Sequence, residues 1–204
     1  DNMSLLRTIA APAIGGAVAG IGWWILRTTG EVRTVKSTLK SSDSLPINRT
    51  LTDAFLQLIV VGSGMSLGRE NAPRQTSAAM TDRMGTFTRL EPTDRAILLA
   101  SAAGAGLGAV YNVPVAGALF SLEVLGLARR KRSIVVAVVM SCIATATAWP
   151  IIGWRAVYDF PEVLPNTAVL FWASLWVIFI VPCAWLVGES FFRASQYASA
   201  HQPR

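Results

Sequence analysis

The chain has 204 residues, of which 52% are hydrophobic and 15% are charged, and its formal net charge is +6. Because soluble domains carry about 25% charged residues, this composition excludes an ordinary soluble domain and indicates a protein of the lipid bilayer. The basic residues stand between apolar stretches and do not follow one polar face, which argues against nucleic acid as a partner. Their pattern is typical of short cytoplasmic loops, with anionic-lipid binding as a second use.

The first apolar segment, residues 5–26, is long enough to cross a hydrocarbon core of about 30 Å. Small residues recur along it at a spacing that lets two helices pack closely: Gly15, Gly16, Ala19 and Gly20. Residues 28–48 are polar and predict a loop with one short helix. Residues 51–67 are apolar again and end in glycines.

A glycine-rich break follows, and it carries the adjacent pair Arg69 and Glu70 between apolar stretches. An ionisable pair at membrane depth is costly and usually lines a substrate or ion path; an ion pair in a surface loop is the alternative. A helix is predicted from about residue 72 to residue 90. Its first turn has unpaired N–H groups and the positive end of the helix dipole, which together attract an anion. Glu70 would compete with that anion, so we expect a gate that opens when Glu70 is protonated.

A second break lies at Asn112, Val113 and Pro114, between the small, apolar residues 95–111 and a short apolar helix over residues 115–127. We expect both helices to be too short to span a bilayer alone, which predicts a discontinuous or re-entrant arrangement inside protein. Broken helices in corresponding positions indicate an ion site. A simple turn between two helices is the alternative.

Two more apolar spans are predicted at residues 134–152 and 169–192, with a polar loop between them and a kink at Pro182. His201, the single histidine, stands in a polar tail, and Cys142 and Cys183 lie far apart in apolar segments. Neither a metal site nor a cofactor motif is therefore expected. Ser63 lacks a histidine base, which argues against an intramembrane protease and against an enzyme in general.

Two long motifs, residues 66–73 and 102–123, resemble those of the CLC chloride channels and proton-coupled chloride exchangers. The resemblance implies that Glu70 is the gating glutamate and that the anion is bound by residues from two motifs: Thr29, Gly30, Gly68, Arg69, Glu70, Asn71 and Ala72. Two departures from the family pattern stand out. Asn71 and Ala72 delay the proline of the gate motif by one position, and the Ile-Pro that should follow Gly30 is absent.

The resemblance also bears on proton coupling, because exchangers of this family commonly have a proton-relaying glutamate at the position of Val124. Valine cannot carry a proton, so we expect a channel-like chloride pathway with a glutamate gate rather than strict coupling. The alternatives are a chloride/proton antiporter and a non-conducting membrane subunit or fragment.

The fold that the resemblance implies is an all-α polytopic membrane protein with broken and re-entrant helices, built from two inverted repeats. Residues 1–204 would be part of that domain: the first repeat without its earliest helices, and without the second repeat. The expected partners are chloride or a similar small anion, the lipid bilayer and, in the full-length protein, a second copy. The expected location is the bacterial inner membrane.

Overall fold

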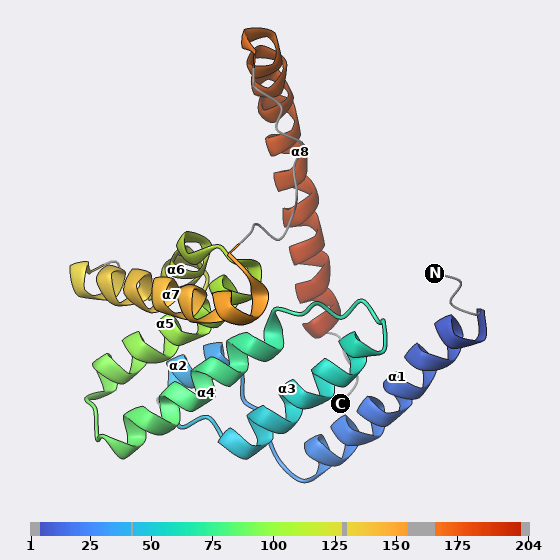
Figure 1. Ribbon diagram of the computed structural model, residues 1–204, viewed down its shortest axis with the longest axis vertical. Helices are drawn as coiled ribbons and strands as arrows, with labels where there is room; N and C mark the ends of the chain where they lie inside the picture. The colour runs from blue at the N-terminus through green and yellow to red at the C-terminus, as the bar shows by residue number, and fades with distance from the viewer. Residues whose placement is uncertain (1–4, 42, 128–129, 155–165, 201–204) are drawn as a thin grey trace. The chain divides into compact units, whose positions relative to one another are not determined.

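The computed structural model describes residues 5–41, 43–127, 130–154 and 166–200, and in these ranges all regular structure is helical. The chain divides into two compact units, residues 1–158 and 159–204, which are described separately. The first unit holds seven helices (Figure 1): α1 (Leu5–Thr28), α2 (Val35–Ser41), α3 (Ile47–Gly62), α4 (Asn71–Phe87), α5 (Pro92–Tyr111), α6 (Pro114–Glu123) and α7 (Lys131–Ile152). The second unit holds α8 (Thr167–Ala200).

Three of these helices are long and apolar enough to cross a membrane: Arg7–Thr28 in α1, Lys131–Ile152 in α7 and Thr167–Ala198 in α8. They coincide with the three long spans predicted from hydropathy, so the prediction of an all-helical, polytopic membrane fold is confirmed. Pro182 lies inside α8, which is one helix of 34 residues. The polar loop predicted between α7 and α8 falls largely at residues 155–165, outside the described residues.

The helix α5 is the centre of the first unit, since α2, α4, α6 and α7 all pack against it. Its small residues explain this position. A side-chain carbon at Gly104 would lie 2.2 Å from the backbone oxygen of Gly117 on α6, and one at Gly106 would lie 2.7 Å from that of Pro73 on α4. Only glycine lets these backbones approach so closely. Hydroxyls add to the contact, since Ser77 donates to the oxygen of Ala102 at 2.7 Å.

The helix boundaries differ from prediction at three places. The helix α4 begins at Asn71 although Pro73 follows, because a proline in the first turn gives up an N–H group that has no intrahelical partner there. The helix α5 begins at Pro92 and has 20 residues, or about 30 Å of helix. The prediction that it is too short to span was therefore wrong in length. The helix α6 is shorter than predicted and ends at Glu123.

The break between α5 and α6 is present where it was predicted. Asn112 adopts the left-handed conformation with φ of 54°, which ends α5, and Pro114 is the first residue of α6. Asparagine is one of the few residues that adopt this conformation readily, and proline suits the first helical position. The two residues together therefore give a sharp turn with little strain.

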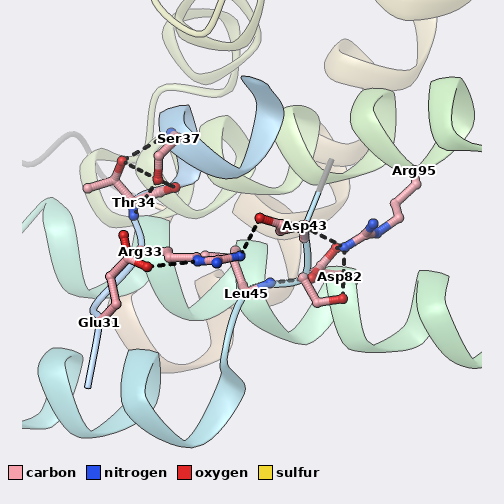
Figure 2. A network of polar contacts seen from close by, with 9 residues as sticks. Glu31, Arg33, Thr34, Ser37, Asp43, Leu45, Asp82 and Arg95 are labelled. Carbon is pink, nitrogen blue, oxygen red and sulfur yellow. Dashed lines mark hydrogen bonds and ion pairs between the residues drawn. The ribbon is translucent and has the colours of Figure 1, made fainter. Parts of the chain in front are cut away.

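A buried ion pair joins α4 and α5 to the loop before α3 (Figure 2). Asp82 on α4 is 1% exposed and accepts hydrogen bonds from Arg95 Nε at 2.7 Å and from the Leu45 N–H at 2.8 Å. Arg95 also donates to the backbone oxygen of Asp43 at 3.1 Å. Asp43 in turn pairs with Arg33 at 2.7 Å. The charges of Asp82 and Arg95 are thus fully compensated, and the pair fixes the loop that precedes α3.

Candidate functional site

Glu70 stands at the start of α4, where its backbone is the N-terminal cap of the helix. Its side chain makes no capping hydrogen bond to the first turn of α4. The carboxylate is instead turned back over Gly68: a side-chain carbon at Gly68 would lie 2.5 Å from Glu70 Oε1, and Gly68 has a φ of 81°. Both the space and the backbone conformation require glycine at position 68. The glycine of this motif therefore allows the carboxylate to lie beside the helix start.

Tyr111, the last residue of α5, is the hydrogen-bond partner of Glu70. Its hydroxyl donates to Glu70 Oε2 at 3.2 Å. The guanidinium carbon of Arg69 lies 5.3 Å from the centroid of the same ring, within the range of a cation–π contact. The break after α5 thus meets the break before α4, and the two motifs that the sequence placed about forty residues apart are in contact. The sequence offered no pattern that singled out the phenol of Tyr111.

Arg74, one turn into α4, is a second residue that the sequence did not indicate. It donates a hydrogen bond to Asn71 Oδ1, and its guanidinium carbon lies 5.6 Å from the centroid of the Phe120 ring on α6. Burial lowers the pKa of this guanidinium, and the charge of Glu70 partly opposes the shift. Its Nε atom is buried and has no hydrogen-bond partner among the described residues. The start of α4 therefore holds a carboxylate, a partly buried guanidinium and two aromatic rings.

Asn71 links the start of α4 to α1 and α3 through a line of hydrogen bonds, which we call the Asp53–Asn71 network. The amide of Asn71 donates to Gln57 Oε1 at 3.0 Å, the amide of Gln57 donates to Asp53 Oδ2 at 2.7 Å, and the indole of Trp23 donates to Asp53 Oδ1 at 2.8 Å. The asparagine that departs from the family pattern is thus the side chain that anchors this helix start.

An open groove of about 800 Å³ runs beside this network. Residues from α1, α3, α4 and the loop after α1 line it, among them Trp23, Gly30, Asp53, Gln57, Asn71 and Gln75. Gln75 is 7% exposed and its Oε1 has no hydrogen-bond partner among the described residues. Gly30 and Asn71, which the resemblance places in the anion site, share this groove.

Thr29 and Ala72 were also predicted to bind the anion, but their surroundings differ from those of Glu70. The Thr29 hydroxyl donates to the backbone oxygen of Ile25 at 2.7 Å, and the Thr29 backbone oxygen accepts from Arg49 at 2.5 Å. This hydroxyl is thus engaged by the last turn of α1 and would have to rotate to reach an anion. Ala72 is 5% exposed and packs in the interior of the first unit.

The polar residue of the second break faces α7 rather than Glu70. Asn112 accepts a hydrogen bond from the Trp149 indole at 2.8 Å and donates to the backbone oxygen of Trp154 at 3.1 Å. Val113 is exposed and Pro114 begins α6. These contacts give the break a structural role in holding α7.

Val124 caps the C-terminal end of α6 and is 54% exposed. It lines a second groove, of about 790 Å³, together with the basic side chains Lys36, Lys40 and Arg130. Among the described residues no group of three His, Cys, Asp or Glu side chains is arranged to hold a metal ion.

Comparisons with known proteins agree on one family. A family model described as "Voltage gated chloride channel" matches residues 13–203. A chloride/fluoride channel protein of Pseudomonas syringae pv. tomato is 32% identical over 127 residues, which is 61% of this chain and 26% of that protein. The voltage-gated ClC-type chloride channel ClcB of Salmonella typhimurium is 30% identical over 131 residues, 61% of this chain and 31% of ClcB. The matches therefore span less than a third of the length of these relatives.

Proposed function

Because the chain belongs to the voltage-gated chloride channel family, we propose that it forms part of a transmembrane pathway for chloride or a similar small anion, with Glu70 as the gate. The observation that carries the proposal is the position of the Glu70 carboxylate. It lies beside the start of α4, held by the Tyr111 hydroxyl at 3.2 Å, and leaves the N–H groups of the first turn without a side-chain cap.

The start of α4 provides the attraction for an anion. Its free N–H groups and the positive end of the helix dipole stabilise negative charge. A negative Glu70 offers its own charge to the same region, and a neutral Glu70 does not. Around Glu70 lie Arg69, Arg74 on α4 and Tyr111 on α5. Acidification should therefore favour anion entry by neutralising the Glu70 carboxylate.

We propose that the second groove is a basic entrance to the pathway, with the acidic side chain of Glu123 also in its lining. Lys36, Lys40 and Arg130 line it, and excess basic residues in short loops mark the cytoplasmic side. Such a cluster raises the local concentration of small anions. Val124 lies in the same groove and cannot carry a proton, which favours channel-like transport over strict proton coupling. A chloride/proton antiporter and a non-conducting membrane subunit are the competing functions.

The proposed functional assembly is larger than this chain. We propose that residues 1–204 supply the first of two inverted repeats, that a second repeat completes the pore, and that two complete subunits pair in the bacterial inner membrane. The basis is the family match, the fraction of the relatives' length that the chain spans, and the bacterial sources of these relatives.

Chloride efflux from liposomes that contain the complete protein tests the proposal. We expect efflux above that of empty liposomes, and Glu70→Gln should raise it at neutral pH because the neutral amide removes the competing charge. Glu91→Gln, a change at an exposed glutamate that caps α5, is the matched control and should leave efflux unchanged. Absence of chloride efflux from correctly folded protein would favour the non-conducting subunit.

A chloride gradient imposed across the same liposomes separates channel from exchanger. The channel-like proposal predicts no uphill proton movement. Steady proton pumping driven by the chloride gradient would establish the antiporter, and an acid other than residue 124 would then have to carry the proton.

A further inference from the structure

Arg74 differs from the other partly buried arginine on the neighbouring helix in how its charge is compensated. Arg95 forms an ion pair with Asp82 at 2.6 Å. Arg74 has no carboxylate within ion-pair distance among the described residues, and a neutral amide, that of Asn71, accepts its hydrogen bond. Burial lowers the pKa of the Arg74 guanidinium, and the charge of Glu70 only partly opposes this shift.

The guanidinium of Arg74 is also held in place. Asn71 fixes one terminal nitrogen, and Asn71 is itself anchored to Gln57 on α3 at 3.0 Å. The guanidinium carbon of Arg74 lies 5.6 Å from the centroid of the Phe120 ring on α6. A cation that is positioned in advance loses little conformational freedom when it binds an anion.

One donor of this guanidinium stays unused. The Nε–H group is buried and lacks an acceptor among the described residues. A buried donor without an acceptor is costly, and hydrogen bonds from a charged donor are among the strong ones. The Arg74 guanidinium is thus a positioned cation with an unused N–H donor near Glu70, the proposed gate. These are the properties of a group that binds a small anion.

We propose that Arg74 is a second anion-coordinating residue of the pathway, which attracts the Glu70 carboxylate when the gate is charged and a permeating anion when Glu70 is neutral. This proposal rests on the proposed function of the chain. It assigns to the first turn of α4 a side-chain ligand in addition to its backbone N–H groups.

Chloride binding to the complete, detergent-solubilised protein, measured by isothermal titration calorimetry, tests the proposal. The measurement is made in a Glu70→Gln background, so that the gate carboxylate does not compete. Adding Arg74→Gln should weaken chloride binding about tenfold or more, as expected for the loss of a charged hydrogen-bond donor. Arg74→Lys keeps the charge but loses the Nε–H donor, so its chloride affinity should fall between that of the background and that of Arg74→Gln. Arg83→Gln, at an exposed arginine of the same helix, is the control and should have no effect.

Two results would overturn the proposal. One is an unchanged chloride affinity after Arg74→Gln. The other is an equal loss in Arg74→Gln and Arg74→Lys, because the guanidinium would then serve only the contact with Asn71. Should Arg74→Gln fail to fold, the chloride-to-nitrate permeability ratio of Arg74→Lys decides: a changed ratio supports coordination by the guanidinium, and an unchanged ratio contradicts it.

The design distinguishes failure of this inference from failure of the proposed function. If the Glu70→Gln protein neither binds nor conducts chloride, the proposed function itself is wrong. If it conducts chloride and differs from the parent protein, but the Arg74 variants match their background, then Glu70 is the gate and Arg74 is not an anion ligand.

Discussion

The helix α4 carries charged side chains near its end and at its start, and the charges at these two places are compensated in different ways. Asp82, near its end, is 1% exposed and is satisfied by Arg95 and by the Leu45 N–H (Figure 2). Glu70, at its start, accepts a hydrogen bond of 3.2 Å from Tyr111, and Arg74 Nε has no partner in the part of the chain that the structure describes. A fully compensated pair holds helices together. On our proposal, a guanidinium with no ion-pair partner among the described residues keeps its attraction for a mobile anion.

The largest effect should come from breaking the compensated pair. Arg95→Met leaves Asp82 charged and buried, which costs about 3–5 kcal/mol of folding free energy when one partner of a buried ion pair is removed. Chemical denaturation of the complete protein in detergent measures it. Asp82→Asn added to Arg95→Met should recover part of the loss, because the buried charge is gone. A loss below about 1 kcal/mol would mean that the pair of Asp82 and Arg95 stabilises the fold no more than an exposed ion pair does.

A smaller effect should follow from loosening the start of α4. Asn71→Ala removes the acceptor of Arg74 and the donor to Gln57, so we expect a loss of about 1–3 kcal/mol from the partners left unsatisfied. The same denaturation experiment measures it, with Asn48→Ala on the exposed face of α3 as the control. Equal stability of the two variants would show that the Asp53–Asn71 network does not stabilise the start of α4.

The contact between Glu70 and Tyr111 should affect function more than stability. The Tyr111 hydroxyl donates to the Glu70 carboxylate and holds it beside Gly68. Tyr111→Phe removes this bond, so the carboxylate can leave the start of α4 more easily and chloride efflux at neutral pH should rise, while the free energy of unfolding should change by less than about 1.5 kcal/mol. Tyr197→Phe on α8 is the control. An unchanged efflux in Tyr111→Phe would show that the hydroxyl does not hold the carboxylate in place.

The smallest effect should come from an exposed pair. Arg132 lies 2.9 Å from Asp94, and its side chain is 69% exposed. Because solvent screens such pairs, Arg132→Gln should change the free energy of unfolding by less than about 1 kcal/mol. A loss as large as that of Arg95→Met would mean that burial does not distinguish the ion pairs of this fold.

The sequence was most informative where one physical requirement acts locally. Long apolar runs predicted α1, α7 and α8, since only a helix satisfies its own backbone in lipid. Pro114 and the adjacent Asn112 marked the break before α6, because one restricts the backbone and the other tolerates the left-handed conformation. Length was harder to predict: Pro92 starts α5 earlier than the apolar pattern indicated, because proline and charged residues fit a first turn.

For the candidate site the sequence proposes a central residue and says less about its surroundings. Glu70 stands out as a charge in a glycine-rich break, and that signal is local. Tyr111 and Arg74 are recognised only when α4, α5 and α6 come together, since nothing in their own segments distinguishes an aromatic or basic residue that faces Glu70. Thr29 shows the reverse: its position matched a motif, yet its hydroxyl is engaged by α1.

The most direct test of the central claim is chloride efflux from liposomes across a range of pH, with the complete protein and Glu70→Gln reconstituted at equal amounts. The account predicts that efflux through the parent protein rises on acidification and that efflux through Glu70→Gln is already high and nearly independent of pH. If both proteins respond to pH in parallel, the carboxylate of Glu70 is not the gate.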